Sequence, residues 1–203
     1  MKNTFLFLSF LSLSGLSANA CTSYLITRGA SKDGSTMISY AADSHIRYGE
    51  LYFRKAGKHA SGTMITCYDR GTNKPLAQIP QAAETYRVVG MTNEFGVSIG
   101  ESTFGGISHL QDTTGGVDYG SLMFYTLQRV KTAREAIKFM VELVEEYGYY
   151  SSGESFSISD PNEVWYMEMI GKGTKMSQPR KAGEQPVNLR RGAVWVALLV
   201  PDG

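Results

Sequence analysis

The sequence is organised around one short stretch near its start, which reads Ser17-Ala18-Asn19-Ala20-Cys21-Thr22-Ser23-Tyr24. Upstream of this stretch lie a basic residue, Lys2, and an apolar run over residues 5–13. A basic start, an apolar run and a small-x-small triplet together form the layout of a secretory signal peptide. We therefore predict that residues 1–20 are a leader and that cleavage after Ala20 makes Cys21 the first residue of the mature chain.

A cysteine at the start of a mature chain carries a nucleophile and a base on one residue. A free thiol, with a pKa of about 8.5, is only a few per cent ionised at neutral pH, whereas an α-amine with a pKa of about 7.7–8.0 can accept its proton. The stretch therefore predicts an N-terminal-nucleophile hydrolase with Cys21 as the nucleophile. Two alternatives stay open: a lipoprotein acylated on Cys21, and a chain in which Cys21 is simply where cleavage stopped. Ala18 stands where lipoprotein signals usually have leucine, which speaks against the first alternative.

The composition is that of one ordinary globular domain, with 20 Lys plus Arg against 19 Asp plus Glu in 203 residues. A near-neutral balance gives no reason to expect a nucleic acid or an anionic membrane surface as partner. The long apolar run lies in the leader and is too short to span a bilayer. We therefore expect an exported bacterial protein, periplasmic, on the cell surface or secreted, with no membrane contact unless Cys21 is lipidated. A homo-oligomer stays open.

The chain has two cysteines, Cys21 and Cys67. Cys67 lies in the run 63–68, which has the composition of a strand, and we expect it to be a small buried hydrophobe there. A disulfide between the two is the alternative, since exported proteins often pair their cysteines. Such a bond would consume the thiol of Cys21, the one place where a free thiol has an evident use.

The pattern downstream alternates between hairpins and helices. Apolar residues at helical spacing predict two consecutive helices within 119–147, joined near Lys131, with Thr132 and Glu135 as a capping box. Extended runs around turn residues predict three hairpins and one last strand: 22–27 with 35–41, 86–91 with 96–102, 155–159 with 164–169, and 193–200. This order favours an α+β sandwich with antiparallel sheets.

The first hairpin brings an acid near Cys21. A turn over residues 31–34 places Asp43 opposite Thr22, and a two-residue turn places Asp43 opposite Tyr24. In either register the Asp43 carboxylate can hold and orient the α-amine of Cys21. The alternative is an aspartate that accepts backbone N–H groups at a strand end. His45 lies close to Cys21 on the same register and is a weaker candidate for an orienting group.

Asn93 lies in the tight connection of the second predicted hairpin. Asparagine is common in turns because it tolerates left-handed backbone angles, and a structural role is one interpretation. The other is that its backbone N–H or its amide donates to a developing oxyanion. The histidines have no metal-ligand spacing and the glycines no phosphate-loop spacing, so no metal or cofactor is expected.

Several motifs taken together resemble peptidase family C69, a family of dipeptidases in the N-terminal-nucleophile superfamily. The matching stretches are Cys21-Thr22-Ser23, the run 29–37, Ala42-Asp43-Ser44-His45, Thr92-Asn93-Glu94-Phe95-Gly96-Val97 with residues 100–103, and Trp165-Tyr166-Met167-Glu168. The resemblance implies an αββα sandwich and cysteine-type hydrolysis of dipeptides. It also implies Cys21 as nucleophile, Asp43 as the group that orients the amine, and Asn93 as an oxyanion donor.

Two features depart from that family. Tyr40 stands where many members have an arginine, three residues before the aspartate, and family members run much longer than this chain. A strand that runs almost to Gly203 agrees with the second point, so we expect residues 21–203 to be the N-terminal part of a larger domain. Two functions remain as alternatives to a dipeptidase: an acylase or bile-salt-hydrolase type of amide hydrolase, and a lipidated surface module that binds without chemistry.

Overall fold

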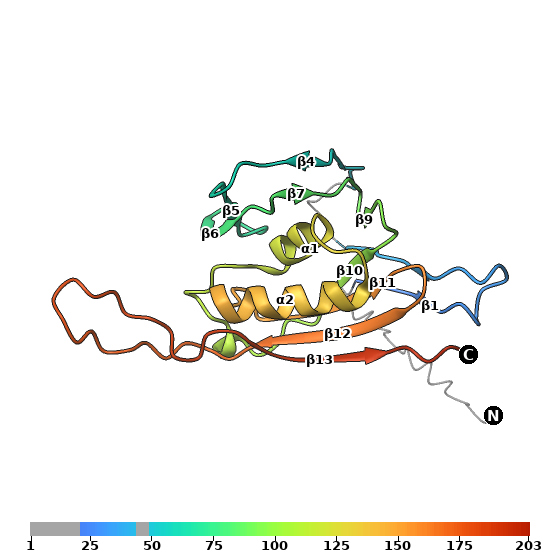
Figure 1. The fold of residues 1–203 in the computed structure, drawn as a ribbon. Helices are drawn as coiled ribbons and strands as arrows, with labels where there is room; N and C mark the ends of the chain where they lie inside the picture. Colours follow the sequence, from blue (N-terminus) through green and yellow to red (C-terminus); the bar gives the residue numbers. More distant parts are fainter. Residues whose placement is uncertain (1–20, 44–48) are drawn as a thin grey trace, which may run out of the picture.

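The structure, a computed structural model, describes residues 21–43 and 49–203. The predicted leader and His45 therefore lie outside the described residues. Within them, the largest sheet has seven antiparallel strands in the order β13-β12-β11-β10-β9-β8-β3 (Figure 1). Their bounds, in that order, are Ala193–Leu199, Val164–Gly171, Gly153–Ser159, Ser98–Thr103, Thr92–Asn93, Val88–Val89 and Phe53–Arg54.

The two faces of this sheet follow from the alternation of side chains along each strand. In the register of β10, β11 and β12, Ile99 pairs with Ile158 and Phe156 pairs with Met167. All four side chains are fully buried and belong to the hydrophobic core. The residues between them point to the other face, and many of those are serines: Ser98, Ser102, Ser155, Ser157 and Ser159.

Two helices cover the apolar face. Helix α1 spans Tyr119–Leu127 and α2 spans Ala133–Tyr147, as predicted from their spacing. The Asp118 carboxylate caps α1, and the Thr132 hydroxyl caps α2 by accepting the N–H of Glu135 at 3.1 Å. Glu135 reaches back to the N–H of Lys131, so the predicted capping box forms with a shift of one residue. No helix in the described part is long and apolar enough to cross a membrane.

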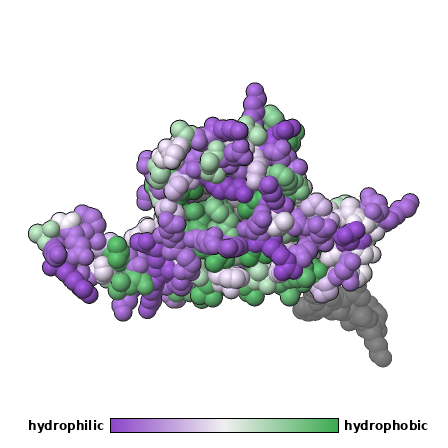
Figure 2. All heavy atoms as spheres, viewed as in Figure 1, coloured by the Kyte–Doolittle hydropathy of each residue, from purple (hydrophilic) through white to green (hydrophobic). Residues whose placement is uncertain are grey.

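Small antiparallel ribbons lie on the far side of the helices from the main sheet (Figure 1). They are β4 (Gly57–Lys58) with β7 (Glu84–Thr85), and β5 (Met64–Tyr68) with β6 (Pro75–Pro80). Hydrogen bonds join β5 to α1, since the Tyr125 hydroxyl donates to the carbonyl of Thr66 at 2.9 Å. Apolar residues gather in the middle of Figure 2, between these ribbons and the lower strands. The loop between β12 and β13 projects from the body and is largely hydrophilic (Figures 1 and 2).

The last short pair, β1 (Leu25–Ile26) with β2 (Met37–Ile38), lies on the face of the main sheet opposite the helices. Its strands contact β10, β11 and β12, and Gly100 of β10 is the point where Tyr40 packs on the sheet. The structure thus confirms a mixed α/β fold with antiparallel sheets. The described residues contain neither a second large sheet nor a second helical layer, so they do not by themselves form an αββα sandwich.

Two of the predicted hairpins need correction, whereas the third and the last strand form as expected. The run 86–102 contains an additional short strand, β9, which pairs with both β8 and β10. Two tight turns therefore replace the single predicted connection, and glycines at positive φ, Gly90 and Gly96, stand in them. The second predicted run, 96–102, is observed as β10 with a shift of its ends, Ser98–Thr103. The register of the first hairpin is also different and concerns the candidate site.

Candidate active site around Cys21

Cys21 begins the described chain and enters the first hairpin. Thr22 and Ala41 exchange backbone hydrogen bonds of 3.2 and 3.1 Å, which close the hairpin one residue after Cys21. The carbonyl oxygen of Cys21 accepts the hydroxyl of Ser102 at 3.0 Å and so ties Cys21 to β10. Its thiol is free, and the residue is partly buried. Cys21 is therefore held against the serine-bearing face of the main sheet while it keeps contact with solvent.

The register of this hairpin places Asp43 differently from both predictions. Thr22 pairs with Ala41 and Leu25 with Ile38, so Asp43 lies two residues beyond the partner of Thr22 and opposes neither Thr22 nor Tyr24. The register shifts because residues 28–31 fold into turns in place of pairing: the N–H of Ala30 donates to Thr27, and that of Ser31 to Arg28. Asp43 is exposed and still lies at the same end of the hairpin as Cys21.

A group of polar side chains that sequence reasoning did not assign lies on the same sheet face as Ser102. Ser155 pairs with Ser102 across β10 and β11 and with Glu168 across β11 and β12. The Tyr166 hydroxyl lies 2.7 Å from Glu168 Oε1, to which it donates, and 2.9 Å from the Ser155 hydroxyl. The signal for this group was the alternation of serines in 98–102 and 155–159, which places hydroxyls on one face of paired strands.

A second polar cluster lies on the helix side of β10 and is almost fully buried. Glu101 and Glu154 are 3% and 4% exposed, although each carries a carboxyl group. Glu101 accepts the Tyr40 hydroxyl at 2.7 Å and the Thr103 hydroxyl at 3.1 Å. Burial, together with the negative charge of Glu101, raises the pKa of Glu154 to about 8. The buried Tyr149 hydroxyl has no hydrogen-bond partner among the described residues.

Tyr40 links this cluster to the hairpin that carries Cys21. It lies two residues after the end of β2 and directly precedes Ala41, the partner of Thr22. Its Cβ packs close to Gly100, where a side chain would lie only 3.0 Å away, so only glycine leaves room for the ring. Burial and the hydrogen bond to Glu101 raise the pKa of Tyr40, which keeps the hydroxyl protonated as a donor. The tyrosine that replaces the arginine expected at this position therefore anchors the hairpin to β10.

Asn93 makes hydrogen bonds that hold the fold together. Its side-chain amide donates to the carbonyls of Leu127 and Val130, at 2.9 and 2.7 Å, at the end of α1. Its side-chain oxygen accepts two backbone N–H groups of the following turn, both at 3.0 Å, and its own backbone N–H donates to Val97. All of its N–H groups are thus engaged, and the predicted oxyanion donor has no free donor in this structure. The structural interpretation fits these contacts.

The two cysteines have different surroundings. Cys67 is fully buried in β5, as predicted, and burial raises the pKa of its thiol to about 11. Both cysteines are free, so the alternative of a disulfide between them does not hold in this structure. A buried thiol that resists ionisation is unreactive, whereas a partly exposed thiol at the end of a hairpin can meet a substrate.

Two clefts in the described part of the chain lie away from Cys21. One, of about 310 Å³, is bordered by α1 and the turn after β5, and the other, of about 590 Å³, lies beside β4 and β7. Neither is lined by Cys21. No group of three or more His, Cys, Asp or Glu side chains in the described ranges could hold a metal ion. His59 lies 3.1 Å from the Thr85 hydroxyl, and His109 lies in a short 3-10 helix, Ser108–Leu110.

These observations define the class of protein: a mixed α/β fold with antiparallel sheets and a free, partly buried cysteine on the polar face of its main sheet. The comparison with protein families matches residues 60–203 to peptidase family C69. The chain therefore belongs to peptidase family C69, the family predicted from the motifs.

The curated relatives have the same character. The chain is 27% identical to a probable dipeptidase of Latilactobacillus sakei over 205 residues, which cover 91% of this chain and 38% of the relative. It is also 27% identical to a dipeptidase of Bifidobacterium longum, over 90% of this chain and 36% of that protein. A probable dipeptidase B of Streptococcus pyogenes serotype M1 matches 74% of this chain at 27% identity. The matched part of the chain thus covers about a third of the length of these relatives.

Proposed function

We propose that this protein is a cysteine-type dipeptidase that is exported and matures by loss of residues 1–20. The observation that carries the proposal is the position of Cys21. Its thiol is free, its main chain is fixed to β10 by Ser102, and it stands where the predicted cleavage would expose an α-amine. Membership of peptidase family C69 and the names of the relatives support the choice of dipeptides as substrates.

The proposed reaction uses the thiol and the amine of Cys21 in turn. The sulfur attacks the peptide carbonyl while the amine takes the thiol proton, and the ammonium then protonates the leaving amine as the C–N bond breaks. The product is a thioester between the acyl group and Cys21. Water, deprotonated by the same amine, attacks this thioester, releases the acid and regenerates the thiol.

Asp43 and the serine-bearing face supply the surroundings of this reaction. Asp43 lies at the same end of the hairpin as Cys21, and in the proposal its carboxylate holds the α-amine. Ser155 and Tyr166 are the hydroxyl groups on the adjoining strands, and we propose that they face bound substrate. We also propose that the whole protein completes the αββα sandwich of N-terminal-nucleophile hydrolases, with the β1–β2 hairpin as the start of the second sheet.

The first test is the intact mass of the protein purified from an exporting bacterial host, with sequencing of its N-terminus. A chain that starts at unmodified Cys21 supports the mechanism, because thiol and amine are then both present. Acylated Cys21 would favour the lipidated binding module, and a start at any other residue would remove the catalytic amine. Either of these two results would overturn the proposal.

The second test compares the two cysteines by substitution. Cys21→Ala is expected to lower dipeptide hydrolysis by more than about 10³-fold, since the nucleophile is lost. Cys67→Ala is the matched control, because it removes the buried thiol and leaves the site intact. Hydrolysis is measured on a panel of dipeptides and on acyl amides, with iodoacetamide labelling as a readout of the free thiol. Turnover confined to acyl amides would replace the dipeptidase by an acylase, and equal loss in both variants would refute Cys21 as nucleophile.

A further inference from the structure

Arg54 is a partly buried arginine with a buried Nε, and no described carboxylate pairs with it. It ends β3, at the edge of the main sheet, and its guanidinium carbon lies 3.4 Å from the centre of the Phe124 ring on α1. Its Nε–H is buried, and no described residue accepts a hydrogen bond from it. Burial lowers the pKa of Arg54, and the groups that oppose this effect are the phenols of Tyr125 and Tyr52, not a carboxylate.

Other stacked arginines of the described chain have partners. Arg134 lies over the ring of Trp165 and is held by both carboxylate oxygens of Glu163, the closer at 2.8 Å. Arg129 lies near the ring of Tyr125 and donates to two carbonyls and to a glutamine side chain. Loss of water from a guanidinium is costly unless hydrogen bonds or an anion replace it. Arg54 is therefore prepared for a ligand that those other arginines do not need.

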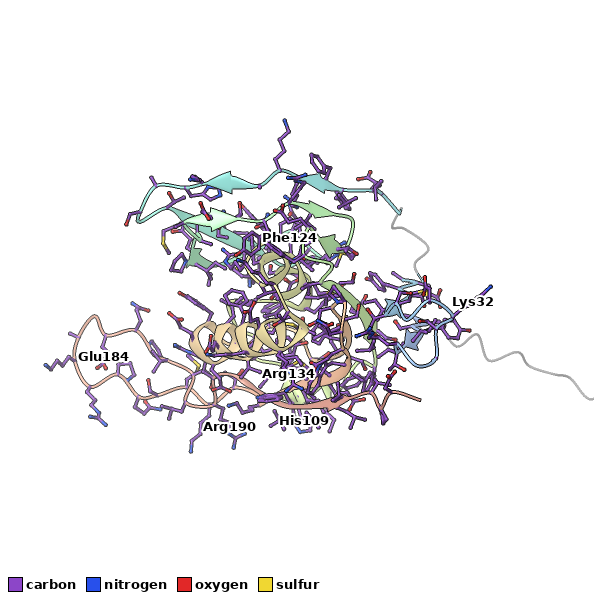
Figure 3. All side chains as sticks on the ribbon, turned by 45° about the vertical axis from the view of Figure 1, so that its right-hand side comes forward. Lys32, His109, Phe124, Arg134, Glu184 and Arg190 are labelled. Atoms are coloured by element: carbon purple, nitrogen blue, oxygen red, sulfur yellow. The ribbon has the colours of Figure 1, made fainter. Side chains whose placement is uncertain are left out.

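The space beside Arg54 has the form and charge for such a ligand. The cleft of about 310 Å³ is lined by Arg54, by a second arginine, Arg70, and by the rings of Tyr68 and Phe124. Its one acidic lining residue, Asp69, accepts hydrogen bonds from the N–H groups of Gly71 and Thr72 in its own turn. Phe124 appears in Figure 3 on α1, beneath the small ribbons and far from Lys32 at the tip of the β1–β2 hairpin.

We propose that this cleft binds the carboxylate of a small ligand that carries an aromatic or other flat apolar group. The carboxylate takes the N–H donors of Arg54, for which a planar guanidinium is the best match among side chains. The flat group lies against the rings of Tyr68 and Phe124. The C-terminus of a short peptide and a free aromatic acid share this chemistry. The inference does not depend on the proposed function, because Cys21 takes no part in the cleft.

The experiment measures binding of three probes to the chain by ligand-observed NMR titration: N-acetyl-phenylalanine, its C-terminal amide, and 3-phenylpropionate. Both acids are expected to bind in the millimolar range, and the amide at least about 10-fold more weakly, since it lacks the charge that Arg54 recognises. Tighter binding of N-acetyl-phenylalanine than of 3-phenylpropionate assigns the cleft to peptide C-termini, and equal binding assigns it to aromatic acids in general. Repeating the titration with Cys21→Ala separates binding from turnover.

Arg54→Met tests the role of the guanidinium, because it keeps the length and apolar stem of the side chain. It is expected to weaken the binding of both acids by at least about 10-fold, and Arg54→Lys is expected to weaken it by a smaller factor. Arg134→Met, which removes a stacked arginine outside the cleft (Figure 3), is the matched control and is expected to change binding by less than twofold. Without ligand, Arg54→Met is expected to melt no lower than the unchanged chain, which a purely structural arginine would not allow. Equal binding of acid and amide, or unchanged binding to Arg54→Met, would overturn the proposal.

Discussion

The two faces of the seven-stranded sheet are built by the same strands and carry opposite chemistry. The face toward α1 and α2 is apolar, yet it encloses Glu101 and Glu154 at the end of β10 and β11. The other face carries serines, Tyr166 and Glu168, and receives the hairpin with Cys21. Burial of two neighbouring carboxyl groups disfavours the ionisation of both, as the raised pKa of Glu154 shows.

This difference in side chains determines what each face of the sheet can hold. Serine side chains are short, so the β1–β2 hairpin packs closely on this face and buries Ser155, Ser157 and Ser159. Gly100 leaves room for Tyr40, because a residue without a side chain lets the tyrosine pack on β10 from the hairpin side and reach Glu101. Cys21 therefore lies at the polar face, and the hydrogen bond from Tyr40 to Glu101 ties its hairpin to the buried cluster. The following changes test this division, in order of expected effect.

Glu154→Gln is expected to have the largest effect on stability. The pKa of Glu154 is raised in the fold from its ordinary value of 4.5 to about 8. A raised pKa means that the protonated carboxyl stabilises the fold fully below pH 4.5, and that this contribution is lost as the pH rises toward 8. Glutamine stays neutral at every pH. At pH 8 the free energy of unfolding of the variant is therefore expected to exceed that of the unchanged chain by on the order of 3 kcal/mol, and at pH 4 the two are expected to be equal.

Urea unfolding over this pH range is the measurement. Glu168→Gln, the same carboxyl-to-amide change on the opposite face of the sheet, is the matched control. If the unfolding free energies of Glu154→Gln and the unchanged chain run parallel from pH 4 to 9, Glu154 is ionised within the fold and the contrast between the faces fails.

Asn93→Ala separates a structural asparagine from a catalytic one. The substitution leaves two carbonyls at the end of α1 and two N–H groups of the adjoining turn without their partner. A loss of about 2 kcal/mol in the free energy of unfolding is expected, with kcat unchanged at a temperature where the variant is folded. Asn162→Ala, in an exposed turn, is the control. A large fall in kcat at unchanged stability would restore the oxyanion role.

Asn93 also illustrates what the sequence could and could not predict. The helices, their capping residues and the hairpin of β11 and β12 depend on neighbours in sequence, and their signals were sufficient. The sequence could not separate a turn asparagine from an oxyanion donor, because that choice depends on contacts with Leu127 and Val130, more than 30 residues away. The predicted register of β1 and β2 was wrong for a local reason, because two successive turns form in place of the single tight turn that was expected.

The residues of the candidate site also fall into those that local sequence predicts and those that only the long-range pairing of strands brings together. Cys21 was predicted as a nucleophile from local features, because the small-x-small triplet and the apolar run directly precede it in the sequence. Ser102, Ser155 and Tyr166 come from strands that pair at long range, so only the register of β10, β11 and β12 shows that they share a face. The Tyr40–Glu101 contact was equally hidden, because it requires a glycine at position 100 and an open strand edge in the same place.

Tyr40→Phe gives the smallest expected effect and the most direct comparison, because each face of the sheet has one tyrosine bound to one glutamate. Tyr40 donates to Glu101, which is 3% exposed, and Tyr166 donates to the partly exposed Glu168, both at 2.7 Å. Water can replace the phenol at Glu168 but not at Glu101. Tyr40→Phe is therefore expected to cost about 1 kcal/mol and Tyr166→Phe less than about 0.5 kcal/mol.

The rate of Cys21 alkylation extends this comparison to the site. Tyr40 adjoins Ala41, which closes the hairpin beside Cys21, so loss of its anchor is expected to speed alkylation by iodoacetamide severalfold. Tyr166→Phe leaves that anchor intact and is expected to leave the rate within about twofold, because its own contacts lie on β11 and β12. Equal rates in the two variants would mean that the buried face does not hold Cys21, and that the hydrogen bond from Ser102 is sufficient to position it.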